Sequence, residues 1–141
     1  MQTFLPFPDF AASAAVLDDA RLGKQRVEAY QVLRTLDGVT SSWRHHPVVK
    51  MWRGYEGALV EYALRICDEW DRRGRADTVR EKLAVHARAI DGMAPWLGDP
   101  ALHASHRSNL LRKDPQWYGR FGWDEPDDLP YVWPRSDRDA A

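Results

Sequence analysis

Apolar side chains recur every three or four residues through the middle of this chain, and this spacing constrains the fold more than any other feature. The pattern runs from Val48 to Trp70, a stretch of about six helical turns. A proline suits the first turn of such a helix and a glycine suits its end, and Pro47 and Gly74 stand at those places. The spacing therefore predicts one amphipathic helix over residues 47–73.

The same reasoning predicts helices along most of the remaining chain, and no stretch alternates in the way that a β-strand requires. Residues from 114 onward combine prolines and glycines with many aromatics, which indicates an ordered coil packed on the helices. We expect an all-α protein, a compact single-domain helical bundle over residues 1–134 with an aromatic-rich C-terminal coil and a flexible tail over 135–141. The further helices expected are 9–16, a helix from Asp18 or Asp19 to Leu36, 79–91 behind a capping box at Thr78–Glu81, and 100–112.

Length and composition narrow the class of protein. A chain of 141 residues is long enough for one domain with a core. It has no apolar run that could span a membrane and no signal-peptide pattern, so we expect a cytoplasmic protein without a membrane partner. The single cysteine, Cys67, reads as a small core residue.

The net charge of -1 hides an uneven distribution. Residues 124–141 hold six acidic and two basic side chains, so the preceding 123 residues carry 18 bases against 15 acids. The bases concentrate in residues 20–50 and 100–123. Two such zones fit an anionic partner, and solvated helix faces are the alternative.

The first candidate for binding chemistry is the segment Arg21–Arg26, near the start of a predicted helix. Cations at this end oppose the helix dipole, which favours an anionic ligand. Alternatively, Lys24 pairs with Glu28 one turn on. Gly23 lowers helix stability, so either a close ligand or backbone, or tight helix packing, must explain it.

A second candidate is the connection before Pro47, where Trp43, Arg44, His45 and His46 follow one another. An aromatic ring, a fixed cation and two imidazoles beside helix N-terminal amides suit a stacked base and a phosphate. The alternative is that Trp43 fills the core and one histidine caps the helix.

The third candidate lies in the predicted helix 100–112. His103 and His106 are spaced as two metal ligands could be, but the spacing reveals no third ligand, so we expect no metal. Fixed charge and hydrogen-bonding groups near an aromatic pair favour phosphate and base contacts instead. These residues are His106, Arg107, Asn109, Arg112, Lys113, Trp117 and Tyr118.

Several blocks of this sequence resemble the pyrimidine-dimer DNA glycosylases of the phage endonuclease V type, and more closely the bacterial proteins placed in that family. The resemblance implies a compact all-α DNA repair enzyme without a cofactor, which flips a nucleotide out and cleaves the glycosidic bond and then the strand through a Schiff base. The blocks are Arg21–Glu28, Trp43–Pro47, His106–Pro115, Trp117–Gly122 and Leu129–Pro134.

The family chemistry carries over with two departures. The phage enzyme attacks with the α-amine of a threonine exposed by removal of the initiator methionine. An α-amine suits this role because its pKa is about 8, against about 10.4 for lysine. Here Gln2 is too large for efficient removal of Met1, so the α-amine available as nucleophile would be that of Met1. The family glutamate aligns, without gaps, with Gly23, which leaves Asp18, Asp19 and Glu28 as nearby carboxylates, the first two as helix caps.

The leading hypothesis is a DNA glycosylase and AP lyase that acts on a damaged or modified base by nucleotide flipping, with DNA as its partner. Met1 or Lys24 would be the nucleophile, His45 or His46 would transfer protons, and Arg21, Arg26, Arg107 and Arg112 would bind phosphates. One alternative is a non-catalytic reader of modified or distorted DNA. Another is a metal-dependent hydrolase that uses His103 and His106.

Overall fold

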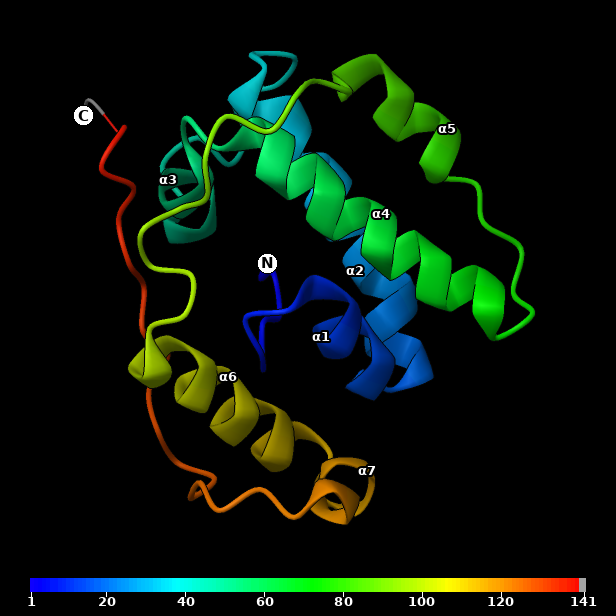
Figure 1. The fold of residues 1–141 in the computed structure, drawn as a ribbon, viewed down its shortest axis with the longest axis vertical. Helices are drawn as coiled ribbons and strands as arrows, with labels where there is room; N and C mark the ends of the chain where they lie inside the picture. Colours follow the sequence, from blue (N-terminus) through cyan, green and yellow to red (C-terminus); the bar gives the residue numbers. More distant parts are fainter. Residues whose placement is uncertain (140–141) are drawn as a thin grey trace.

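The computed structural model describes residues 1–139, and within that range it contains helices and turns but no β-strand (Figure 1). The all-α prediction is confirmed. None of the helices in this range is long and apolar enough to cross a membrane. The helices are α1 (Phe10–Val16), α2 (Asp19–Leu36), α3 (Pro47–Trp52), α4 (Glu56–Arg72), α5 (Arg80–Leu83), α6 (Pro100–Lys113) and α7 (Pro115–Tyr118), with 3₁₀ turns at Ala84–His86 and Gly119–Phe121.

Helices α2 and α4 lie side by side and form the centre of the molecule (Figure 1). Gly23 explains how closely they approach, because a Cβ atom there would lie 2.8 Å from the ring of Trp70. Tight helix packing therefore explains Gly23, rather than close approach of a ligand or of another backbone. Cys67 is fully buried on α4, and burial raises the pKa of its thiol to about 12, so the thiol stays protonated.

The single helix expected over 47–73 is wrong, because the chain makes two helices with a turn between them. Gly54 adopts a φ of 84° in that turn, and a Cβ there would lie 2.5 Å from the side chain of Arg138. Trp52, Tyr55 and Leu59 are nonetheless all buried. The apolar spacing therefore continues through the turn, and spacing alone could not reveal it.

The helix expected over 79–91 is also too long. Regular structure ends at His86, and Ala87 and Ile90, which lie on the apolar stripe of a helix over 79–91, are exposed. The ring of His86 is buried and contacts Asp37 at the end of α2, 2.5 Å from Nδ1 to Oδ2. This contact holds the chain at His86, after which Ala87 is extended and the backbone of Ala89 packs closely against Gly57 of α4.

The expected capping box at Thr78 is replaced by a cap one residue earlier. The carboxylate of Asp77 accepts hydrogen bonds from the backbone N–H of Val79, at 3.2 Å, and of Arg80, at 2.9 Å. Asp77 also receives the guanidinium of Arg26 from α2. One buried carboxylate therefore both caps α5 and ties it to the central helix pair.

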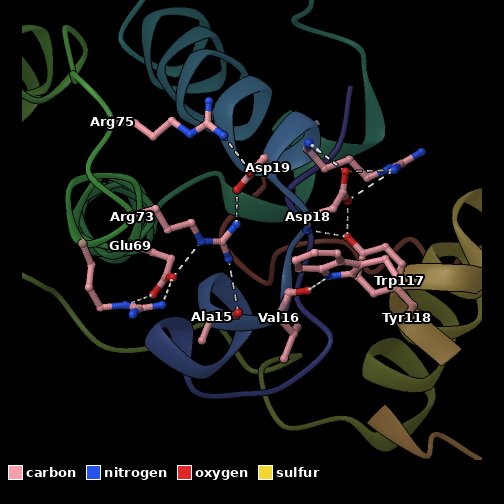
Figure 2. A network of polar contacts seen from close by, with 11 residues as sticks. Ala15, Val16, Asp18, Asp19, Glu69, Arg73, Arg75, Trp117 and Tyr118 are labelled. Atoms are coloured by element: carbon pink, nitrogen blue, oxygen red, sulfur yellow. Dashed lines mark hydrogen bonds and ion pairs between the residues drawn. The ribbon is translucent and has the colours of Figure 1, made fainter. Parts of the chain in front are cut away.

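The start of α2 is held from two sides (Figure 2). Asp18 is its N-cap and binds the hydroxyl of Tyr118 from α7, with Oδ1 2.5 Å from the hydroxyl oxygen. Asp19 pairs with Arg73 at 2.9 Å and with Arg75 at 2.7 Å, both just beyond the end of α4. Both aspartates are thus engaged in the fold, and the start of α2 is fixed relative to α4 and α7.

After α7 and the short turn Gly119–Phe121, the C-terminal segment is a coil. It runs from α7 back along α6 and up past α3 (Figure 1). The tail expected to be flexible over 135–141 is anchored as far as residue 139, and residues 140–141 lie outside the described range. Ser136 donates to the backbone oxygen of Arg53 at 2.6 Å. Tyr55 donates to Asp137 at 2.5 Å, and Arg53 pairs with Asp139 at 2.9 Å.

Candidate active site

Residues 2–5 are buried inside the helical bundle, and Met1 is partly buried (Figure 1). Gln25 of α2 accepts a hydrogen bond from the backbone N–H of Phe4 at 2.9 Å and donates one to the carbonyl of Gln2 at 2.6 Å. Tyr62 of α4 donates to the carbonyl of Phe4 at 2.7 Å. These bonds satisfy buried backbone groups in a segment that belongs to no helix or strand.

Two further side chains hold this segment from the opposite side. The ring of His106 on α6 accepts from the backbone N–H of Leu5 at 2.8 Å, and Trp52 of α3 donates to the hydroxyl of Thr3 at 3.0 Å. Side chains of four helices therefore fix the N-terminal segment, and the position of the chain's first atoms is set by the core.

A cavity of about 400 Å³ opens beside the N-terminus. This volume is within the range of small-ligand sites. Its walls come from the N-terminal segment, the first half of α2, the end of α6 and the C-terminal coil. The side chains that supply its chemistry are Met1, Arg21, Lys24, Glu28, Lys113 and Tyr131.

Glu28 is the carboxylate of this cavity. Its side chain is only 13% exposed, and Oε2 accepts a hydrogen bond from the backbone N–H of Gln2 at 2.9 Å. Three covalent bonds separate that nitrogen from the Met1 α-nitrogen, so the α-nitrogen lies within roughly 6.5 Å of Oε2. The chain thereby brings together a primary amine and a carboxylate at one end of a cavity.

Cations surround this pair. Lys24 is 75% exposed and its Nζ lies 3.5 Å from Oε1 of Glu28, which is the pairing that the sequence offered as an alternative. Arg21 is held by Asp18 at 3.2 Å. Burial and the nearby charges of Arg21, Arg112 and Lys24 lower the pKa of Lys113. Clustered positive charge at a cavity mouth suits a polyanionic ligand.

The residues of the Trp43–His46 connection lie outside the cavity lining. His46 caps α3, because its Nδ1 accepts from the backbone N–H of Val48 at 3.0 Å. Burial, together with the positive charge of the Met1 amine, lowers the pKa of His46, so the ring lies within electrostatic reach of the N-terminus. His45 is exposed and accepts a hydrogen bond from Arg44 at 3.1 Å.

The expected phosphate contacts Arg26 and Arg107 are both engaged within the protein. Arg26 is 12% exposed, pairs with Asp77 at 2.5 Å and lies over the ring of Trp70. Arg107 pairs with Glu125 of the C-terminal coil and donates to the carbonyl of Pro6 at 2.7 Å. Neither guanidinium lines the cavity.

Other expected nucleic-acid contacts are also occupied by the fold. Asn109 is buried and donates to the carbonyls of Ser105 and Leu129, and it accepts from Arg112, which is itself exposed. Tyr118 is fully buried, with its hydroxyl on the cap of α2. Trp117 is partly buried and donates to the carbonyl of Val16 at 2.8 Å.

Both ring nitrogens of His103 and Nδ1 of His106 are used in the fold, whereas Nε2 of His106 is buried without a hydrogen-bond partner among the described residues. Nδ1 of His103 donates to the carbonyl of Leu5 at 2.7 Å, and its Nε2 accepts from the backbone N–H of Gly98 at 2.9 Å. Burial lowers the pKa of His106 to about 3, with a smaller contribution from His103. Among residues 1–139, no group of three or more possible ligands is arranged to hold a metal ion.

Sequence reasoning missed two members of the cavity. Glu28 was among the nearby carboxylates, but counting from Met1 matched the family glutamate to Gly23, one helical turn and a half away. Its hydrogen bond to Gln2 could be found only in three dimensions. Tyr131 lies in a proline-rich coil without periodicity, so no sequence pattern places its ring beside α2.

Comparison with known proteins identifies the family of this chain. The family model described as pyrimidine dimer DNA glycosylase matches residues 1–83, which is more than half of the chain and includes the N-terminus and Glu28. No curated protein and no solved structure matches the chain. The match of the family model shows that this chain belongs to the pyrimidine dimer DNA glycosylase family.

Proposed function

We propose that this protein is a DNA glycosylase and AP lyase that acts on a damaged or modified nucleotide flipped into the cavity. The observation that carries the proposal is the position of Glu28, which binds the backbone of residue 2 at the end of a cation-rimmed cavity. Family membership supports DNA as the substrate. The Met1 amine is the nucleophile in this proposal.

The chemistry needs an amine and a carboxylate close together. The amine nitrogen attacks the sugar carbon C1′, the glycosidic bond breaks, and the base leaves with the bonding electrons and takes up a proton. Loss of a proton from nitrogen and opening of the sugar ring give an imine. Removal of a proton from C2′ then expels the 3′ phosphate and cleaves the strand.

Glu28 suits two parts of this sequence. Its negative charge, shielded from water, stabilises the positive charge that develops on the sugar, and its Oε1, which faces the exposed Lys24 at 3.5 Å, can accept a proton from the attacking amine. Arg21, Lys24 and Lys113 would hold the phosphates beside the flipped nucleotide. His46 stays a candidate for proton transfer through Nε2, since its Nδ1 is used in the cap.

The deciding experiment is borohydride trapping on a duplex with a single abasic site, followed by mass spectrometry of the adduct. We expect the sugar on the Met1 peptide. Glu28→Gln should lower the trapping rate by roughly 10²-fold to 10⁴-fold while DNA affinity is retained. Glu61→Gln is the matched control, because Glu61 lies on the outer face of α4 and pairs with Arg65, and it should react like the wild type.

Two results would contradict the proposal. An adduct on Lys24 that disappears in Lys24→Arg would assign the nucleophile to that lysine. Specific binding of damaged duplexes without any adduct would identify the protein as a reader of damaged DNA. In either case the role given to the Met1 amine is wrong.

A further inference from the structure

A row of four aromatic rings leads away from the cavity along the surface. Tyr131 lines the cavity, and its ring centroid lies 5.5 Å from that of Trp133. Trp133 is 5.7 Å from His46, and His46 is 5.8 Å from Trp43. The row, Tyr131–Trp133–His46–Trp43, joins the C-terminal coil to the connection before α3.

The two tryptophans of the row remain partly in water, at 42% exposure for Trp43 and 37% for Trp133. The contacts of His46 with both of them are close to perpendicular, at 72° and 83°. A perpendicular contact covers at most one face of either ring, so each tryptophan keeps at least one face that its contact with His46 does not use.

The fold gives no reason for leaving these rings exposed. The coil that carries Trp133 is held by polar bonds on either side, from Ser136 to the backbone of Arg53 and from Val132 to Ser105. Anchoring the coil therefore does not require an exposed indole. Contiguous exposed apolar surface beside a site is typical of a binding face.

Positive charge lies at both ends of the row. Burial raises the pKa of Tyr131, and the guanidiniums of Arg112 and Arg21 oppose this rise, which places both charges near the cavity end. Arg44 is exposed next to Trp43 at the other end. Aromatic faces between fixed cations are the combination that binds single-stranded nucleic acid, with bases on the rings and phosphates on the cations.

We propose that the row Tyr131–Trp133–His46–Trp43 binds unpaired DNA bases that continue the strand from the nucleotide in the cavity. This inference rests on the proposed function, because that function places the first nucleotide. It assigns to the row a substrate preference: DNA whose pairing is lost next to the damaged nucleotide, as in a gap or a bulge, binds more tightly than a fully paired duplex.

The test compares two duplexes that carry the same tetrahydrofuran abasic analogue, one fully paired and one with two unpaired thymidines beside the analogue. Trp43→Leu and Trp133→Leu should each weaken binding of the unpaired duplex on the order of tenfold. Trp43→Phe and Trp133→Phe should keep most of the affinity, because phenylalanine retains a stacking face. The paired duplex should bind equally to all variants.

Phe121→Leu is the matched control, since Phe121 is an equally exposed aromatic outside the row. It should leave both affinities unchanged. Circular dichroism melting of each variant separates lost binding from lost structure, and the phenylalanine variants keep the test valid where a leucine variant unfolds. Equal losses for leucine and phenylalanine, equal losses on both duplexes, or no preference of the wild type for the unpaired duplex would each overturn the proposal.

Failure of this proposal is distinguishable from failure of the proposed function. Borohydride trapping at saturating protein reports on the amine alone, so the leucine variants should still form the adduct. A preference for the unpaired duplex without any adduct would support the row and reject the lyase. An adduct without the preference would reject the row and leave the lyase in place.

Discussion

Replacing Arg26 by alanine should destabilise the fold and leave DNA binding intact, although the sequence suggests a phosphate contact at this position. The guanidinium is 12% exposed and its partner Asp77 is 4% exposed, at a distance of 2.5 Å. Arg26 also lies 4.5 Å above the ring of Trp70. Arg26→Ala removes the cation and leaves a buried carboxylate.

Removal of one partner from a buried pair costs about 3–5 kcal/mol. We expect the lower end, about 3 kcal/mol, since Asp77 keeps the two backbone N–H donors of Val79 and Arg80. For a chain of this length the loss corresponds to a fall in melting temperature of roughly 10 °C. Arg65→Ala is the control, because Arg65 pairs only with exposed carboxylates and should cost about 0–1 kcal/mol.

The stability lost in Arg26→Ala should depend on pH in a defined direction. Burial acts to raise the pKa of Asp77, but the hydrogen bonds from Arg26 and from the backbone outweigh it and lower the pKa overall. The stability that this carboxylate contributes is therefore present above its unfolded pKa of about 3.9 and is lost as the pH falls through the lower folded value. The difference between wild type and Arg26→Ala should shrink below about pH 4.

Urea unfolding followed by circular dichroism measures these free energies, and a salt titration of DNA binding completes the test. Folded Arg26→Ala should show the wild-type salt dependence, whereas Lys24→Ala should reduce the slope by about one. A stability within about 1 kcal/mol of the wild type at pH 7, or a reduced salt slope for Arg26→Ala, would refute the structural role given to this residue.

Two further changes probe the packing around the site. Gly23→Ala should lower stability by about 0–2 kcal/mol in urea unfolding, because overpacking against Trp70 outweighs a gain of about 1 kcal/mol in helix propensity; a net stabilisation would show that the indole moves aside freely. Between pH 6 and pH 4 the wild type should lose stability by up to roughly 1.4 kcal/mol per pH unit through His106. In this range the ring of His106 is protonated in the unfolded chain but stays neutral in the folded protein, because burial lowers its pKa. His106→Gln, which can still accept from Leu5, should flatten this slope, and an unchanged slope would place the proton elsewhere.

The sequence predicts helices well where composition changes at their ends and poorly where it does not. The bounds of α6 follow from Asp99 and Pro100 at its start and Pro115 beyond its end. The turn at Gly54 is hidden because apolar residues on both sides keep the helical spacing. Because the helical spacing of apolar residues continues across this turn, the spacing cannot reveal that the helix is interrupted there.

The site is predictable in part for a related reason. Arg21, Lys24 and Lys113 were expected as nucleic-acid contacts and all line the cavity, and charge that opposes a helix dipole or clusters in sequence made them visible. Arg26 has the same sequence signal but faces Asp77, because the direction of a side chain on α2 depends on what packs against it.

The burial of residues 2–5 has a practical consequence for producing the protein. Met1 lines the cavity beside Glu28, so peptide added in front of it starts within the cavity lining and converts the α-amine into an amide. An amino-terminal purification tag would therefore remove the nucleophile of the proposed mechanism, and a low activity measured on such material would reflect the tag. A tag at the carboxyl end, beyond the anchored residue Asp139, leaves the cavity open.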